Sequence, residues 1–219
     1  MLLHGWGGNH ESMLCIAKRL KGVKCIIPDL IGFGVSPHPD YALKVDDYVN
    51  AVIEMLDKER ISRACFICHS FGARIGIKLA AQYNERVSGL ILTGAAGIKP
   101  RRKPMYYIKV FSYKVKKRFG ISTKNAGSSD YQALSDCMKG TFINVVNEDL
   151  TPYLNRITTD TLIVQGERDT ETPMYMAEIM NRRILSSSLI VLKGVGHFAY
   201  VDRIGEFSAI ANSYIDAIK

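Results

Sequence analysis

A serine, an aspartate and a histidine occupy three equivalent places in this sequence of 219 residues. Ser70, Asp169 and His197 each follow a short apolar run that predicts a buried strand. In open α/β sheets, ligands bind at the edge where such strands end. A serine hydroxyl becomes a nucleophile when a histidine takes its proton, and an aspartate can hold the histidine ring in place. These residue types in this chain order predict nucleophilic acyl chemistry.

The stretch around Ser70 is the centre of this prediction. Residues 64–69 predict a buried strand, and the apolar spacing from Ile75 to Tyr83 predicts a helix directly after it. A serine on a sharp strand-to-helix turn projects clear of the sheet. The N–H group of Phe71 is then expected to point into the same space from the helix N-terminus.

Each member of this set also has an ordinary interpretation. Small residues must flank such a serine; Gly72 satisfies this on one side, but Cys68 stands where glycine is usual. Ser70 alone could cap a helix, and Asp169 and His197 alone could be turn and loop residues. Their common position at strand ends, in the order Ser, Asp, His, favours chemistry over coincidence.

Strands and helices alternate along most of the chain. This alternation predicts a mostly parallel sheet with helices on both faces. Expected strands lie at 1–3, 24–28, 64–69, 87–93, 160–165 and 188–192, and expected helices at 11–20, 46–58, 71–83, 173–183 and 204–218.

Composition narrows the class of protein. The length fits one α/β domain, and no apolar run is long enough to span a bilayer. We expect no secretory signal, and the five cysteines in apolar surroundings indicate free thiols, so a cytoplasmic location is expected. Cys65 and Cys68 should face opposite sides of a strand, which argues against a metal or redox pair.

Five short motifs together resemble those of a known enzyme family. They are His4-Gly5-Trp6-Gly7, Asp29-Leu30-Ile31-Gly32-Phe33-Gly34-Val35-Ser36, Cys68-His69-Ser70-Phe71-Gly72, Gly166-Glu167-Arg168-Asp169 and Gly196-His197-Phe198. The set resembles the α/β-hydrolase superfamily, in particular its small cap-bearing esterases and carbon–carbon hydrolases. The resemblance implies a core at 1–97 and 158–219 and a small helical cap at 98–157, inserted after the strand at 87–93. It also implies an oxyanion hole formed by the N–H groups of Trp6 and Phe71, with no metal or organic cofactor.

The beginning of the sequence departs from the family pattern. Family members usually carry two further strands before the His-Gly loop, so the chain resembles a hydrolase without its N-terminal edge. Without those strands, the segment 24–28 would be an open sheet edge, which invites pairing with another chain. A homodimer is therefore a possible assembly.

The predicted cap is strongly basic. The chain carries 29 basic and 21 acidic residues, a net charge of +8. Ten of the bases, and no acidic residue, lie between Lys99 and Lys124. The favoured interpretation is a solvated helix whose apolar face covers the active site. The alternative is a docking face for an anionic acyl carrier, coenzyme A or an acidic membrane surface. Nucleic acid is not favoured, because cap packing accounts for the interleaved aromatic residues.

The sequence as a whole predicts a serine hydrolase that cleaves a carboxylic ester through an acyl-enzyme. Carbon–carbon bond hydrolysis of a dicarbonyl compound is the alternative within catalysis, and a non-catalytic ligand-binding protein is the alternative outside it. The substrate pocket is expected to include Phe111, Phe142, Val146 and Phe198.

Overall fold

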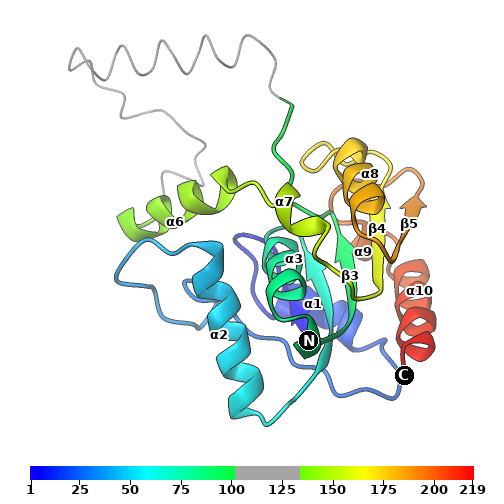
Figure 1. The fold of residues 1–219 in the computed structure, drawn as a ribbon, viewed down its shortest axis with the longest axis horizontal. Coiled ribbons are helices and arrows are strands. Elements are labelled where there is room, and N and C mark those ends of the chain that lie inside the picture. Colours follow the sequence, from blue (N-terminus) through cyan, green and yellow to red (C-terminus); the bar gives the residue numbers. More distant parts are fainter. Residues whose placement is uncertain (102–133) are drawn as a thin grey trace.

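A parallel sheet forms the centre of the molecule (Figure 1). The computed structural model describes residues 1–101 and 134–219. In this part of the chain five strands pair in the order in which they occur, and every neighbouring pair is parallel. The C-terminal ends of the strands therefore lie at one edge of the sheet. The strands are β1 (Leu2–Leu3), β2 (Ala64–His69), β3 (Val87–Thr93), β4 (Thr161–Gly166) and β5 (Ser187–Leu192).

Helices connect the strands and cover the sheet (Figure 1). Most fall where the apolar spacing predicts them. In the described part of the chain they are α1 (Glu11–Ala17), α2 (Val45–Lys58), α3 (Phe71–Gln82), the 3-10 helix η1 (Asn84–Arg86), α6 (Asp136–Asn147), α7 (Thr151–Leu154), α8 (Met174–Arg183), α9 (Ala199–Asp202) and α10 (Ile204–Ala217).

Two hydrophobic cores lie on opposite faces of the sheet. Side chains alternate along β2, so Phe66 and Cys68 enter one core and Ile67 enters the other. Helices α2, α3 and α8 complete the first core, and α1 and α10 complete the second. The predicted parallel sheet with helices on both faces is confirmed.

The two cysteines of β2 follow the same alternation. Cys68 is fully buried in the first core, whereas Cys65 is partly buried against the second. Burial raises the pKa of the Cys65 thiol to about 11, so this thiol stays neutral at physiological pH. The two sulfurs therefore do not form a C-x-x-C pair on one surface.

The segment 24–28 is not a strand, and that prediction is wrong. It touches the sheet through one backbone hydrogen bond, in which the N–H of Leu2 donates to the carbonyl of Ile26 at 2.9 Å. Because β1 is only two residues long, it offers too few backbone hydrogen bonds to hold a neighbouring segment as a regular strand. The outermost strand on this side is therefore β1.

Helices α6 and α7 occupy the interval between β3 and β4, where the sequence predicts a cap. Ser135 caps α6, since its Oγ accepts a hydrogen bond from the N–H of Met138 at 3.3 Å. The helix is tied to the loop before α2, because the N–H of Leu43 donates to Thr141 Oγ1 at 2.9 Å. Most of the predicted basic segment, and Phe111 with it, lies outside the described residues. Within residues 1–101 and 134–219, no helix is both long and apolar enough to cross a membrane.

Candidate active site

Ser70 lies at the joint between β2 and α3 in a strained backbone conformation. Its φ is 49° and its ψ is −104°, a left-handed geometry that residues other than glycine rarely adopt. Three hydrogen bonds hold the turn. The N–H of Ser70 donates to Thr93 O at 3.1 Å, and Ser70 O accepts from the N–H groups of Ala73 at 3.1 Å and Ala96 at 3.3 Å. Such strain persists where the surroundings over-determine it, often at functional sites.

The chain passes very close to β1 immediately after Ser70. A Cβ atom on Gly72 would lie 2.4 Å from the carbonyl oxygen of Leu3, so no larger residue fits there. The N–H of Gly72 also donates to the carbonyl of His4 at 3.1 Å, which joins the glycine-rich loop after β1 to the start of α3. The requirement for a small residue after the serine therefore has a direct steric cause.

Asp169 and His197 form a buried pair. Asp169 follows β4, His197 follows β5, and Asp169 Oδ2 lies 2.8 Å from His197 Nδ1. Thr172 Oγ1 and Gln165 Nε2 also donate to Oδ2, at 2.7 and 3.1 Å. The N–H groups of Glu171 and Thr172 donate to Oδ1, each at 2.9 Å. These contacts fix the carboxylate in one orientation.

The surroundings keep Asp169 ionised. Burial alone would raise its pKa, but the hydrogen bonds from His197 and Thr172 outweigh burial and lower the pKa to about 2. An ionised Asp169 accepts the Nδ1–H of His197, which leaves Nε2 as the nitrogen able to act on a substrate.

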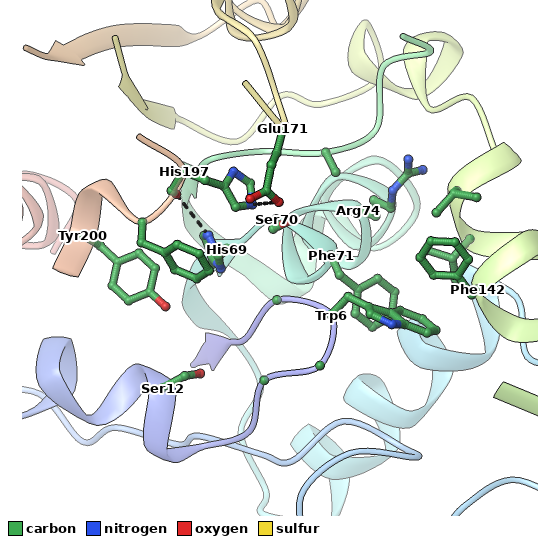
Figure 2. Close-up of a pocket in the computed structure, with 17 residues that line it drawn as sticks. Trp6, Ser12, His69, Ser70, Phe71, Arg74, Phe142, Glu171, His197 and Tyr200 are labelled. Carbon is green, nitrogen blue, oxygen red and sulfur yellow. Dashed lines mark hydrogen bonds and ion pairs between the residues drawn. The ribbon is translucent and has the colours of Figure 1, made fainter. Parts of the chain in front are cut away.

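Ser70 and His197 line the same cavity, whose volume is about 540 Å³ (Figure 2). Within the described residues, no hydrogen bond joins the Ser70 hydroxyl to His197. Nε2 instead lies 3.5 Å from the carboxylate of Glu171, whose side chain is 65% exposed. Contacts between a nucleophile and its base are often long in the absence of substrate, so this geometry is compatible with proton transfer after binding.

The cavity wall includes three of the four predicted pocket residues. Phe142 and Val146, from α6, and Phe198, beside His197, line it, whereas Phe111 lies outside the described residues. Phe142 packs against Trp6, with the two ring centroids 5.1 Å apart (Figure 2). Helix α6 therefore forms one wall of the cavity that holds Ser70.

The two residues predicted for the oxyanion hole lie at the same cavity. Trp6 and Phe71 both line the cavity, and their rings meet edge to face with centroids 5.3 Å apart. Within residues 1–101 and 134–219, neither backbone N–H group donates to a protein acceptor. Backbone N–H groups that have no acceptor in this part of the chain are available to an oxygen that becomes negatively charged.

The family model of the alpha/beta hydrolase fold matches residues 1–117, and a second model, of TAP-like proteins, matches residues 122–215. The chain belongs to the alpha/beta hydrolase fold family. It is a hydrolase of the α/β-hydrolase type.

Three relatives illustrate the range of this α/β-hydrolase family. Lipase 3 of a Moraxella species is 24% identical to this chain over all of it and 78% of the lipase. A 2-hydroxymuconate semialdehyde hydrolase from a Pseudomonas species is 21% identical over 98% of this chain and 86% of that protein. An esterase structure from Exiguobacterium antarcticum superposes with a TM-score of 0.78, at 23% identity, over 98% of this chain and 90% of the esterase.

The structure of this α/β-hydrolase adds cavity residues that the sequence analysis did not select. His69, Arg74, Glu171 and Tyr200 all line the cavity. Two of them could have been found from their positions in the sequence. Arg74 is one helical turn after Ser70, and Glu171 is two residues after Asp169.

His69 is a buried residue that packs against His197. Its ring centroid lies 4.8 Å from that of His197, and its Nε2 lies 3.3 Å from the backbone carbonyl of His197. Burial, together with the neighbouring His197, lowers the pKa of His69 to about 3. A neutral His69 can donate its Nε2–H to that carbonyl and so help to hold the loop that carries His197.

Proposed function

We propose that this protein hydrolyses carboxylic esters through an acyl-enzyme formed on Ser70. The observation that carries the proposal is the placement of the strained Ser70 turn and the His197–Asp169 pair around one cavity. Both elements follow from the sequence, and both match the requirements of a serine nucleophile and its base. The lipase and esterase relatives support an ester as the substrate.

The first half of the reaction forms the acyl-enzyme. His197 Nε2 takes the proton of the Ser70 hydroxyl as Oγ attacks the ester carbonyl carbon. The carbonyl oxygen becomes an oxyanion and accepts hydrogen bonds from the N–H groups of Trp6 and Phe71. When the tetrahedral intermediate collapses, the ester C–O bond breaks and the imidazolium gives its proton to the departing alcohol.

The second half of the reaction releases the acid. A water molecule gives a proton to His197 and attacks the acyl carbon, and the Ser70 oxygen leaves with the proton from the imidazolium. Asp169 acts in both halves, because its carboxylate orients the ring and stabilises the imidazolium. Its lowered pKa means that it stays ionised throughout the range in which the histidine can act as a base.

Two other functions fit parts of the site. The 2-hydroxymuconate semialdehyde hydrolase relative favours carbon–carbon cleavage of a dicarbonyl compound, which the same three residues could serve. A non-catalytic protein could keep the cavity for ligand binding. Hydrolysis of p-nitrophenyl esters of graded chain length, measured beside a dienoate semialdehyde, separates the first two functions.

Labelling by a fluorophosphonate probe tests the nucleophile directly. We expect the wild-type protein to be labelled at Ser70, and the Ser70→Ala variant to be unlabelled and inactive while its circular dichroism is unchanged. Ser62→Ala is the matched control, since Ser62 is an exposed residue outside the cavity. Substantial ester hydrolysis by a folded Ser70→Ala variant would contradict the mechanism.

A further inference from the structure

Arg74 places a cation in the wall of the cavity that holds Ser70. It lies four residues after Ser70 at the start of α3, a separation of about 6 Å along the helix axis. The residue is only 7% exposed. Figure 2 draws its side chain between Ser70 and Phe142 in that view, and all three residues line the cavity.

The guanidinium group has little to bind in the described part of the chain. Its one hydrogen bond there runs from Nη1 to the backbone carbonyl of Glu148, at 2.9 Å. The carboxylate of Glu148 instead pairs with Lys78, at 2.5 Å, and Lys78 also pairs with Asp46, at 2.6 Å. No carboxylate of the described residues lies within ion-pair distance of Arg74.

Burying a guanidinium without a full set of hydrogen-bond partners costs free energy of folding, so a functional reason for the position of Arg74 is expected. Burial lowers the pKa of Arg74 to about 10, although the nearby acidic residues Glu148 and Asp149 counteract part of this effect. The group is therefore still a cation at neutral pH. A guanidinium offers five N–H donors, and the described residues use one of those on Arg74.

The rest of the cavity wall restricts where an anion could bind. The described residues that line the cavity include one basic side chain of the lysine or arginine type, Arg74, and one acidic side chain, Glu171. Glu171 lies beside His197, so a negative charge on that side would be repelled. Around Phe142, Val145 and Val146 the wall is apolar, which suits a short hydrocarbon chain between two polar ends.

We propose that Arg74 binds a carboxylate at the far end of the acyl chain, so that the preferred substrates are half-esters of short dicarboxylic acids. This inference rests on the proposed function, because the ester carbonyl must lie at Ser70. Because Ser70 and Arg74 lie about one helical turn apart, the chain between the ester and the carboxylate must be short, as it is in glutarate. The planar guanidinium fork matches the two oxygens of a carboxylate.

Hydrolysis of matched esters tests the proposal. Monomethyl glutarate carries the charge, and methyl hexanoate is a neutral ester of similar length. We expect Arg74→Gln to lower kcat/KM for monomethyl glutarate by roughly 10- to 100-fold, as for loss of a hydrogen bond to a charged group, and to change methyl hexanoate hydrolysis less than about twofold. Arg74→Lys keeps the charge without the fork and should fall between. Arg183→Gln, an exposed change outside the cavity, is the control.

Binding of free glutarate, measured by calorimetry, separates this inference from the proposed function. We expect wild type to bind glutarate and Arg74→Gln to bind it at least roughly tenfold more weakly. If neither ester is hydrolysed but glutarate binding depends on Arg74, the anion site stands and the proposed function fails. Equal losses for both esters in Arg74→Gln, or equal glutarate binding by the two proteins, would overturn the anion site.

Discussion

The sulfur of Cys68 and the backbone of Gly76 face each other across the contact between β2 and α3. A Cβ atom on residue 76 would lie 2.7 Å from Cys68 Sγ and 3.1 Å from Leu90 Cδ1. The family motif usually has glycine where Cys68 stands, which lets the helix approach the strand. In this chain the space for close packing comes from the helix instead, because Gly76 makes room for the larger strand residue.

We predict that Gly76→Ala destabilises the fold and that Cys68→Gly relieves the effect. The single Gly76→Ala change overpacks a rigid contact, which typically costs about 1–3 kcal/mol. Urea unfolding of wild type, both single variants and the double variant gives the coupling energy between the two positions. Additive effects of the two changes would show that Cys68 and Gly76 do not compensate for each other.

The sequence predicted the fold and the elements around Ser70 because both depend on local patterns. Apolar runs marked the buried strands, and the sharp joint after β2 lies where the sequence predicts it. The segment 24–28 does not form the predicted strand, because a strand needs a hydrogen-bonded partner and β1 provides only two residues for pairing. The spacing places Arg74 one helical turn after Ser70. Among the described residues, however, Arg74 has no carboxylate partner because Glu148 pairs with Lys78, which only the tertiary structure reveals.

We predict that buried His69 makes the fold sensitive to acid. Its pKa falls from 6.5 to about 3 on folding, so the folded state prefers the neutral ring. This contribution to stability is fully present above pH 6.5 and is lost as the pH falls toward 3. The free energy of unfolding should decrease over that range in wild type and decrease less steeply in His69→Gln. Urea titrations at several pH values test this, with the exposed His38→Gln as control.

The basic segment from Lys99 to Lys124 lies mostly outside the described residues. Its ten basic residues, with no acidic residue among them, can attract an anionic acyl carrier or a coenzyme A ester over a long distance. Salt weakens this attraction, because the Debye length is about 8 Å at physiological ionic strength. We expect replacement of Lys109, Lys114, Lys116 and Lys117 by Gln to lower kcat/KM for a coenzyme A ester and to reduce its salt dependence.

A small neutral ester separates steering from a structural role of these lysines. Its encounter with the enzyme is not steered by charge, so its kcat/KM should be nearly unchanged in the four-lysine variant. Monomethyl glutarate adds a second comparison, because an anion held at Arg74 depends on short-range hydrogen bonds that salt screens less than long-range attraction. Its salt dependence should therefore be weaker than that of the coenzyme A ester. Equal losses for charged and neutral esters would mean that the lysines support the fold of the segment, and the steering role would be wrong.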